Sequence, residues 1–211
     1  MYEYVSAEKL ISDLQPVDYI FFKNINTINW KSVVDECHQL SLTHPDYYYP
    51  SVSDDKNGWE PWDDAAKERK KVSISFLDYG YRPDNTMSWK TITKKPPLEW
   101  SMHDSIVKEL PFKKGAMAVP TRQDPGNTFP WHKDEFLYQK RLVDAKDHHR
   151  IVRFITFFED WKNGHYFQVE NSVIIKWKAG DTIVFAPNKE HVGANVGLET
   201  KWTCNITGVL K

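Results

Sequence analysis

The second half of the 211-residue chain is a succession of short, strand-like segments separated by turn signals. β-Branched and aromatic residues gather in stretches of six to ten residues, and several of the joints between them ("DWKNG", "EN", "KAGD") are rich in Asn, Asp and Gly. Short strands at such close spacing predict a mainly β fold, a sandwich or a barrel, with flanking helices. The predicted strands are 115–122, 150–158, 165–170, 172–177, 181–187, 191–196 and 201–210.

Residues 1–113 mix helix and strand signals, and we expect them to support the β region of residues 114–211. Apolar residues recur at helical spacing after Ser6, after Asn29 and after Pro97, which predicts a helix at each place. In the third of these helices the apolar positions lie four residues apart, at Leu98, Met102, Ile106 and Leu110.

Two further strands and one long loop are predicted in this first part. The strands are 19–25 and 72–80, which carry runs of apolar and aromatic residues. The acidic and aromatic segment 46–64 is broken by Pro and Gly and predicts a long loop. Such a loop can close over a site as a lid, or simply pack on the surface.

Charge and cysteine content narrow the classes of protein that the chain can represent. A length of 211 residues predicts a single domain, residues 1–211. The chain has 28 basic and 29 acidic residues, a balance that does not favour binding to nucleic acid. Cys37 and Cys204 form no metal-binding pattern. No signal peptide or long apolar run is present, so we expect a cytoplasmic protein with no membrane partner, and leave its oligomeric state open.

The candidate chemistry lies in "FPWHKDEF", residues 129–136, where His132 and Asp134 are two residues apart. The same spacing at His44 and Asp46 shows that the tripeptide alone is weak evidence. His44 precedes the β region, and its Pro and Asp neighbours are typical of a turn. His132 differs because His191 follows it by 59 residues and opens one of the predicted strands.

Two imidazoles and one carboxylate on one face of a metal ion leave three positions open, which is the arrangement of non-haem Fe(II) oxygenases. His132, Asp134 and His191 supply this set of ligands. The adjacent His148 and His149 do not suit it, because neighbours in an extended chain point to opposite faces.

The motifs "HKD" at 132–134, "WKAGDTIVFAP" at 177–187, His191 and "KWTCNITG" at 201–208 resemble the Fe(II)/2-oxoglutarate-dependent dioxygenase superfamily. The resemblance covers roughly residues 115–208. It implies a double-stranded β-helix, a cupin-like jelly-roll barrel. It also implies an oxidoreductase, a hydroxylase in which His132, Asp134 and His191 bind Fe(II) and 2-oxoglutarate is the cosubstrate. The expected substrates are O₂ and a small molecule or an amino-acid side chain, and the expected products include succinate and CO₂.

A cation is needed to hold the far carboxylate of 2-oxoglutarate. Lys201 lies ten residues after His191, as the basic residue of the resembled family does, and prolyl-hydroxylase-like members use Lys. Thr203 shares its strand face and could help to hold the carboxylate. Arg153 is the rival anchor, because it interrupts an otherwise apolar strand; it could instead pair with an acid such as Glu159 or Asp160, or hold substrate.

Two other functions remain open on the sequence. One is a cupin-like metal enzyme that does not use 2-oxoglutarate, and the other is a non-catalytic jelly-roll module that binds a ligand through its aromatic residues. A nucleic-acid demethylase is less favoured because of the charge balance. Weaker candidates for contacts around the site, each with packing as its alternative, are Trp131, Tyr138, Arg122, Gln123, Asn195 and Asn205.

Overall fold

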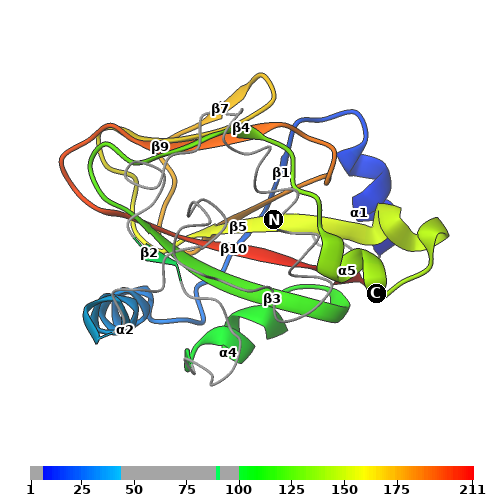
Figure 1. The fold of residues 1–211 in the computed structure, drawn as a ribbon, viewed down its shortest axis with the longest axis horizontal. Helices are drawn as coiled ribbons and strands as arrows, with labels where there is room; N and C mark the ends of the chain where they lie inside the picture. Colours follow the sequence, from blue (N-terminus) through cyan, green and yellow to red (C-terminus); the bar gives the residue numbers. More distant parts are fainter. Residues whose placement is uncertain (1–6, 44–88, 91–99) are drawn as a thin grey trace, which may run out of the picture.

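The computed structural model describes residues 7–43, 89–90 and 100–211. Ten strands in this part of the chain form two antiparallel sheets that face each other (Figure 1). The six-stranded sheet has the order β1-β8-β5-β10-β3-β2, and the four-stranded sheet has the order β4-β9-β6-β7. The strands are β1 (Ile20–Asn24), β2 (Trp89–Lys90), β3 (Phe112–Gln123), β4 (Thr128–His132), β5 (Ile151–Phe157), β6 (His165–Val169), β7 (Ser172–Ile174), β8 (Asp181–Phe185), β9 (His191–Asn195) and β10 (Lys201–Leu210).

From β3 onward the chain passes back and forth between the two sheets. β3, β5, β8 and β10 belong to the large sheet, while β4, β6, β7 and β9 belong to the small one. This alternation between two facing antiparallel sheets is the jelly-roll arrangement, also called a double-stranded β-helix. The predicted fold class is therefore confirmed.

Apolar side chains fill part of the space between the sheets. Ile155 and Phe157 of β5 and Phe185 of β8 point inward and pack against Phe167 of the small sheet. The Phe157 ring also stacks on Trp177, with centroids 4.0 Å apart. Because successive residues of a strand point to opposite faces, Arg153 on β5 also points into the barrel.

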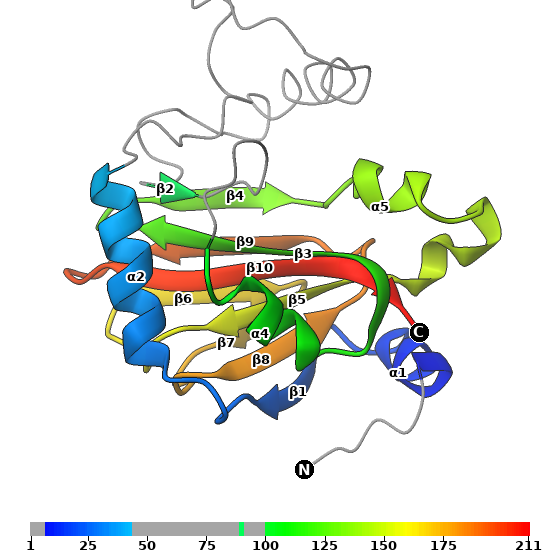
Figure 2. The same cartoon turned by 90° about the horizontal axis from the view of Figure 1, so that it is seen from below.

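The outer face of the large sheet is covered by helices (Figure 2). These are α2 (Trp30–Thr43) and α4 (His103–Lys108), with α1 (Ala7–Leu14) near the end of β10. Val33 and Cys37 of α2 and Ile106 of α4 belong to one buried cluster with Cys204 and Ile206 of β10. The helices thus bury one face of the sheet and leave the other face to line the barrel.

Seven strands predicted in the β region are present, and an eighth, β4, was missed. Pro130 lies inside β4, and proline is unfavourable in a strand because it cannot donate a hydrogen bond to a neighbour. β4 is the edge of the small sheet, where this loss is tolerated. The predicted strand 172–177 is also shorter than expected, since β7 ends at Ile174 and Lys176 has a positive φ of 59°.

The helix predicted after Asn29 is confirmed, with Asn29 Oδ1 accepting from the Ser32 N–H at its start. The helix predicted after Pro97 is wrong in extent, since α4 covers only His103–Lys108. Its last turn tightens, because the N–H groups of Glu109 and Leu110 bond to carbonyls three residues back, and Pro111 follows.

Several predictions fall outside the described residues. They are the Ser6 cap, the His44–Asp46 turn, the loop 46–64, the strand 72–80 and the positions Pro97 and Leu98. Within the described residues, no helix combines the length and the apolar character needed to cross a bilayer.

Candidate metal centre

His132 and His191 lie directly opposite each other on neighbouring strands. β4 pairs antiparallel with β9, and the register of this pair matches His132 with His191. Their ring centroids are 4.2 Å apart. The strand pairing thus brings together two residues that are 59 positions apart in the sequence.

A β-bulge decides which residue of β4 faces the barrel. Phe129 lies opposite Gly193 and His132 lies opposite His191, so β4 contains one more residue than β9 between the two pairs. The extra residue puts Phe129 and His132 on the same face, with their rings 6.5 Å apart. Trp131 points elsewhere and is 41% exposed. The bulge therefore selects His132, and not Trp131, for the inside.

Asp134 completes a group of three potential ligands. One ligand atom each of His132, Asp134 and His191 can be chosen so that all lie within 4.8 Å of one another. Asp134 Oδ2 is 3.6 Å from His191 Nε2. In the described ranges of the chain this is the one such group of His, Cys, Asp and Glu side chains. The structure thus brings the three predicted ligands together.

Main-chain carbonyls orient both imidazoles in the same way. His132 Nδ1 is 2.7 Å from the carbonyl oxygen of Pro130, and His191 Nδ1 is 3.3 Å from that of Lys189. Each carbonyl lies two residues before its histidine and can only accept a hydrogen bond, so Nδ1 carries the hydrogen. Nε2 then keeps its lone pair for a metal. These partners are backbone atoms, which no residue-type pattern in the sequence could reveal.

The charges at this site suit a cation. Burial acts to raise the pKa of Asp134, but the Arg153 guanidinium and the two imidazoles outweigh it and lower this pKa to about 2. Burial, followed by the nearby His132, lowers the pKa of His191 to about 3. At neutral pH Asp134 is therefore ionised and His191 neutral, which are the forms that bind metals.

Arg153 forms an ion pair with Asp134. Its Nε lies 2.9 Å from Oδ2, and its Nη2 lies 2.8 Å from Oδ1. Pairing with Glu159 or Asp160, one alternative from the sequence, is wrong, because both acids pair with lysines instead. The structure thus places Arg153 beside the candidate ligands.

Lys201 lies inside the barrel, with its side chain fully buried. Its ammonium nitrogen is 3.1 Å from Gln123 Oε1, 2.6 Å from the Tyr166 carbonyl oxygen and 3.3 Å from the Ala194 carbonyl oxygen. Ala194 is three residues along β9 from His191, or about 10 Å in the strand direction. Lys201 and the potential metal ligands therefore occupy different levels of the same barrel.

The environment of Lys201 is aromatic as well as polar. The rings of Phe167 and Trp177 have their centroids 5.8 and 5.9 Å from its nitrogen, within the range of a cation–π interaction. Burial lowers the pKa of Lys201 to about 7. Thr203, the next inward residue of β10, is also buried, at 7% exposure. Lys201 and Thr203 thus share one interior face, as predicted.

The weaker candidates separate into those inside the barrel and those outside it. Gln123 contacts Lys201, but Arg122 lies on the outer face of β3, where its Nη1 donates to Ser41 Oγ of α2 at 2.7 Å. Arg122 is therefore no part of the site. Trp131 and Tyr138 are surface residues, at 41% and 44% exposure.

The two asparagines satisfy other polar groups. Asn195 Nδ2 donates to the carbonyl oxygens of Gln123 and Glu199, at 2.9 and 2.8 Å. Asn205 Nδ2 donates to Thr121 Oγ1 at 3.0 Å. Asn195 is fully buried and supports the backbone around the β9–β10 connection, which is the packing alternative stated for it.

His148 and His149 lie in a 3₁₀ helix, η3 (Ala145–Arg150), and not in the extended chain that was assumed for them. His148 Nε2 is 3.3 Å from the Lys140 carbonyl oxygen, and His149 Nδ1 is 2.6 Å from that of Lys146. Neither belongs to the three-ligand group in the described part of the chain. The reason given for excluding them was wrong, although they are not part of the cluster.

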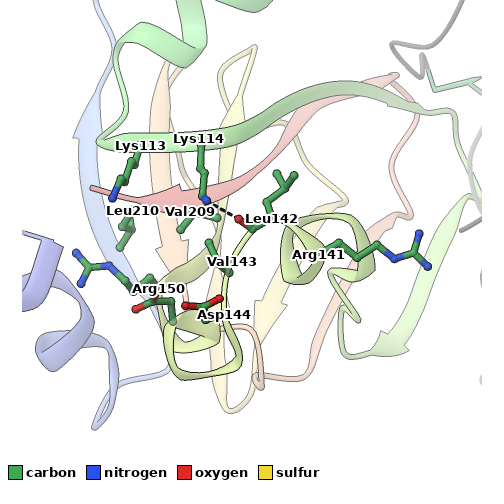
Figure 3. Close-up of a pocket in the computed structure, with 10 residues that line it drawn as sticks. Lys113, Lys114, Arg141, Leu142, Val143, Asp144, Arg150, Val209 and Leu210 are labelled. Carbon is green, nitrogen blue, oxygen red and sulfur yellow. Dashed lines mark hydrogen bonds between the residues drawn. The ribbon is translucent and has the colours of Figure 1, made fainter.

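A cavity of about 360 Å³ lies elsewhere, where β3 begins and β10 ends (Figure 3). Lys114 extends from β3 into it and donates a hydrogen bond to the Leu142 carbonyl oxygen. None of the three potential metal ligands lines this cavity, so it is separate from the metal centre. Its lining residues are Lys113, Lys114, Arg141, Leu142, Val143, Asp144, Asp147, Arg150, Val209 and Leu210.

No protein-family profile and no curated protein sequence matches the chain. Similar solved structures include a prolyl-4-hydroxylase from Pseudomonas putida, with 12% identity and a TM-score of 0.48, over 97% of this chain and 99% of that one. A Trichoplax adhaerens prolyl hydroxylase, in complex with a hypoxia inducible factor oxygen degradation domain peptide fragment, has 12% identity and a TM-score of 0.47, over 96% and 88%. A predicted oxalate decarboxylase from Thermotoga maritima has 15% identity and a TM-score of 0.33, over 44% of this chain and 66% of that one. Likeness at this level says nothing about activity.

Proposed function

We propose that the protein is a non-haem iron dioxygenase that uses 2-oxoglutarate to hydroxylate a small molecule or an amino-acid side chain. The observation that carries the proposal is the cluster of His132, Asp134 and His191 inside a jelly-roll barrel. Both imidazoles are held by carbonyls so that Nε2 is available, and the carboxylate is ionised. This set of two nitrogens and one oxygen matches Fe(II) and leaves coordination positions for other ligands.

The distances in the cluster are compatible with one shared ion. Two atoms bound to the same ion at about 2.0–2.2 Å are at most about 4.4 Å apart. The ligand atoms of the three residues lie within 4.8 Å of one another, so a small inward movement is enough to close the site. The chemistry supplied by bound Fe(II) and 2-oxoglutarate would be hydroxylation of a C–H bond by O₂, with release of succinate and CO₂.

Lys201 and Thr203 are the residues that we assign to the far carboxylate of 2-oxoglutarate. Lys201 is a buried cation in the barrel, and Thr203 is its neighbour on the same face of β10. An ion pair in a dry, low-dielectric interior is stronger than the same pair in water. Gln123 Oε1, one of the acceptors of Lys201, is a side-chain atom whose hydrogen bond the carboxylate would replace.

A second candidate, a cupin-like metal enzyme that does not use 2-oxoglutarate, is favoured by one observation. An ammonium group has three hydrogens to donate. Three oxygen atoms already lie within 3.3 Å of the Lys201 nitrogen. In this candidate Lys201 is a structural cation that ties the two sheets together, and no carboxylate approaches it.

Anaerobic titration separates the two candidates. Wild-type protein is titrated with Fe(II) and then with 2-oxoglutarate, while the visible spectrum is followed for the weak charge-transfer band of the chelate. We expect the band with wild type and not with Asp134→Ala. No band with wild type, and no succinate formed with a broad panel of substrates, would overturn the dioxygenase proposal.

The variant Lys201→Met distinguishes the dioxygenase from the cupin-like metal enzyme. The dioxygenase proposal expects it to bind Fe(II) and to lose affinity for 2-oxoglutarate, whereas the cupin-like candidate expects turnover to be unchanged. Lys113→Met provides a matched control, because Lys113 lies on β3 at the distant cavity.

A further inference from the structure

The ion pair between Arg153 and Asp134 consists of two contacts, one to each oxygen of the carboxylate. Nε and Nη2 of the guanidinium face the two different oxygens of Asp134, at 2.9 and 2.8 Å. Both side chains are largely buried, at 15% and 17% exposure. A planar guanidinium that donates two parallel hydrogen bonds restricts rotation of the carboxylate, which a single point charge cannot do.

The guanidinium is itself held in place by Phe136. The Phe136 ring lies 5.2 Å from the central carbon of the Arg153 guanidinium. Phe136 is buried in a small cluster with Ile151 and Val209. It also has a left-handed backbone, with φ of 50°, which is unusual for a large residue. The segment between β4 and the next helix therefore carries both Asp134 and the aromatic ring that supports its partner.

Asp134 needs such support because no strand fixes it. β4 ends at His132, and Asp134 lies two residues farther on, before α5 (Leu137–Arg141). Its Oδ2 nevertheless lies 3.6 Å from His191 Nε2, while its Oδ1 is turned to Arg153 Nη2. Oδ2 also accepts from Arg153 Nε at 2.9 Å, so Arg153 contacts both oxygens, and Oδ2 is the oxygen that faces His191.

We propose that Arg153 is a positioning residue that orients Asp134 as a one-oxygen metal ligand. This inference rests on the proposed function only in requiring a metal at His132, Asp134 and His191. It gives Arg153 a role that differs from holding the cosubstrate, and it needs no direct contact between Arg153 and the metal.

Two effects of Arg153 on metal binding oppose each other. Its positive charge repels a divalent cation, which would weaken binding. Its two hydrogen bonds keep the carboxylate in the binding orientation, which favours binding, and loss of such outer partners typically costs 10–100-fold in metal affinity. Because the guanidinium engages both oxygens and is held by Phe136, orientation is the larger effect.

The test is the affinity for Mn(II), measured by calorimetry in the absence of 2-oxoglutarate. We expect Arg153→Met to bind Mn(II) about 10–100-fold more weakly than wild type. Arg153→Lys keeps the charge but loses the planar fork, and we expect it also to bind more weakly. Circular dichroism checks that each variant is folded. If Arg153→Met does not fold, Arg153→Lys alone tests the proposal.

Arg122→Met is the matched control. Arg122 also pairs with an aspartate, Asp124, at 3.3 Å and has similar burial, but it lies on the outer face of β3. We expect it to leave Mn(II) affinity unchanged. If both Arg153 variants bind Mn(II) at least as tightly as wild type, the positioning role is overturned while the metal site stands. If wild type itself binds no Mn(II), the metal site and this role fall together.

Discussion

Lys201 on β10 donates to the carbonyl oxygen of Tyr166 on β6, 2.6 Å away, and so joins the two sheets from inside the barrel. Burial lowers the pKa of Lys201 to about 7, while a lysine of the unfolded chain titrates near 10.4. Between these two values the unfolded chain holds a proton that the folded protein lacks. The free energy of unfolding attributable to this residue therefore rises with pH from about 7 to about 10.4.

Lys201→Met should remove this rise. The measurement is urea unfolding of wild type and variant at several pH values from 7 to 10, with the difference between the two isolating Lys201 from other groups. Lys113→Met, at the surface cavity, should keep the wild-type slope. A difference between wild type and Lys201→Met that does not change with pH would contradict the lowered pKa.

Binding of 2-oxoglutarate should be accompanied by proton uptake. A carboxylate placed beside Lys201 favours the charged ammonium and raises its pKa again from about 7. At pH 8.5 Lys201 of the free protein is largely neutral and therefore takes up a proton when 2-oxoglutarate binds. The affinity for 2-oxoglutarate consequently falls by up to about tenfold per pH unit above 7. Calorimetry in buffers of different ionisation enthalpy measures the uptake. Binding to wild type without proton uptake would argue that the carboxylate lies elsewhere.

Gly193→Ala should weaken 2-oxoglutarate binding more than metal binding. A Cβ at this position would lie 3.3 Å from Phe167 Cδ2 and 3.6 Å from the Lys201 nitrogen. The methyl group would crowd the space beside the ammonium, and overpacking of this kind costs about 1–3 kcal/mol of stability. We expect a cost of this size to fall on the bound carboxylate and to lower 2-oxoglutarate affinity about 5–150-fold, with Mn(II) affinity within about twofold, because 1.4 kcal/mol corresponds to a factor of about ten. Equal losses for both ligands would indicate a general distortion of β9.

Mn(II) should raise the thermal stability of wild type and not that of His132→Ala. A ligand that binds only the folded state stabilises it by about 2.7 kcal/mol when present at 100 times its dissociation constant. Loss of one of three ligands removes this binding, while β4 remains paired with β9 through its backbone. His148→Ala, a histidine of η3, should keep the full effect. Equal stabilisation of His132→Ala would place the metal at a different site.

Phe157→Ala should destabilise the protein by about 3–5 kcal/mol, because it leaves a cavity in the inner core. Phe157 is fully buried and stacks on Trp177. Val173→Ala, at an exposed position on β7, should change stability by less than about 0.5 kcal/mol. Chemical denaturation of both variants without metal measures the contrast, and similar values for the two would contradict the assignment of the inner core.

The fold could be predicted from the sequence because its signals are local. The strands of the β region carry runs of apolar and aromatic residues, and the turns between them are marked by Gly, Asn and Asp. No strand was predicted at β4, where Pro130 is unfavourable for a strand, and only the edge position of β4, a property of the whole sheet, makes the proline acceptable. The extent of α4 was wrong because four-residue spacing continues through Leu110, while the backbone has already tightened into a turn.

The candidate site was predictable only in the identity of its side chains. His132, Asp134 and His191 were recognised from spacing and from a family resemblance, and the structure brings them together. The partner of Arg153 could not be found in this way, because Asp134 lies outside any strand and its position depends on the turn at Phe136. The carbonyls that orient the imidazoles are backbone groups, which every residue has, so the sequence could not identify them.

The bulge in β4 means that the pairing of two strands, as much as residue identity, determines the metal centre. If β4 continued residue by residue along β9 from Phe129 opposite Gly193, Trp131 would lie opposite His191, and His132 would point toward solvent. Every ligand would still be present in the sequence, yet the site would be lost. A relative that keeps all three ligands at the same spacing but pairs these strands without a bulge would therefore be a barrel without a metal centre, and an alignment that scores residues alone would not reveal the difference.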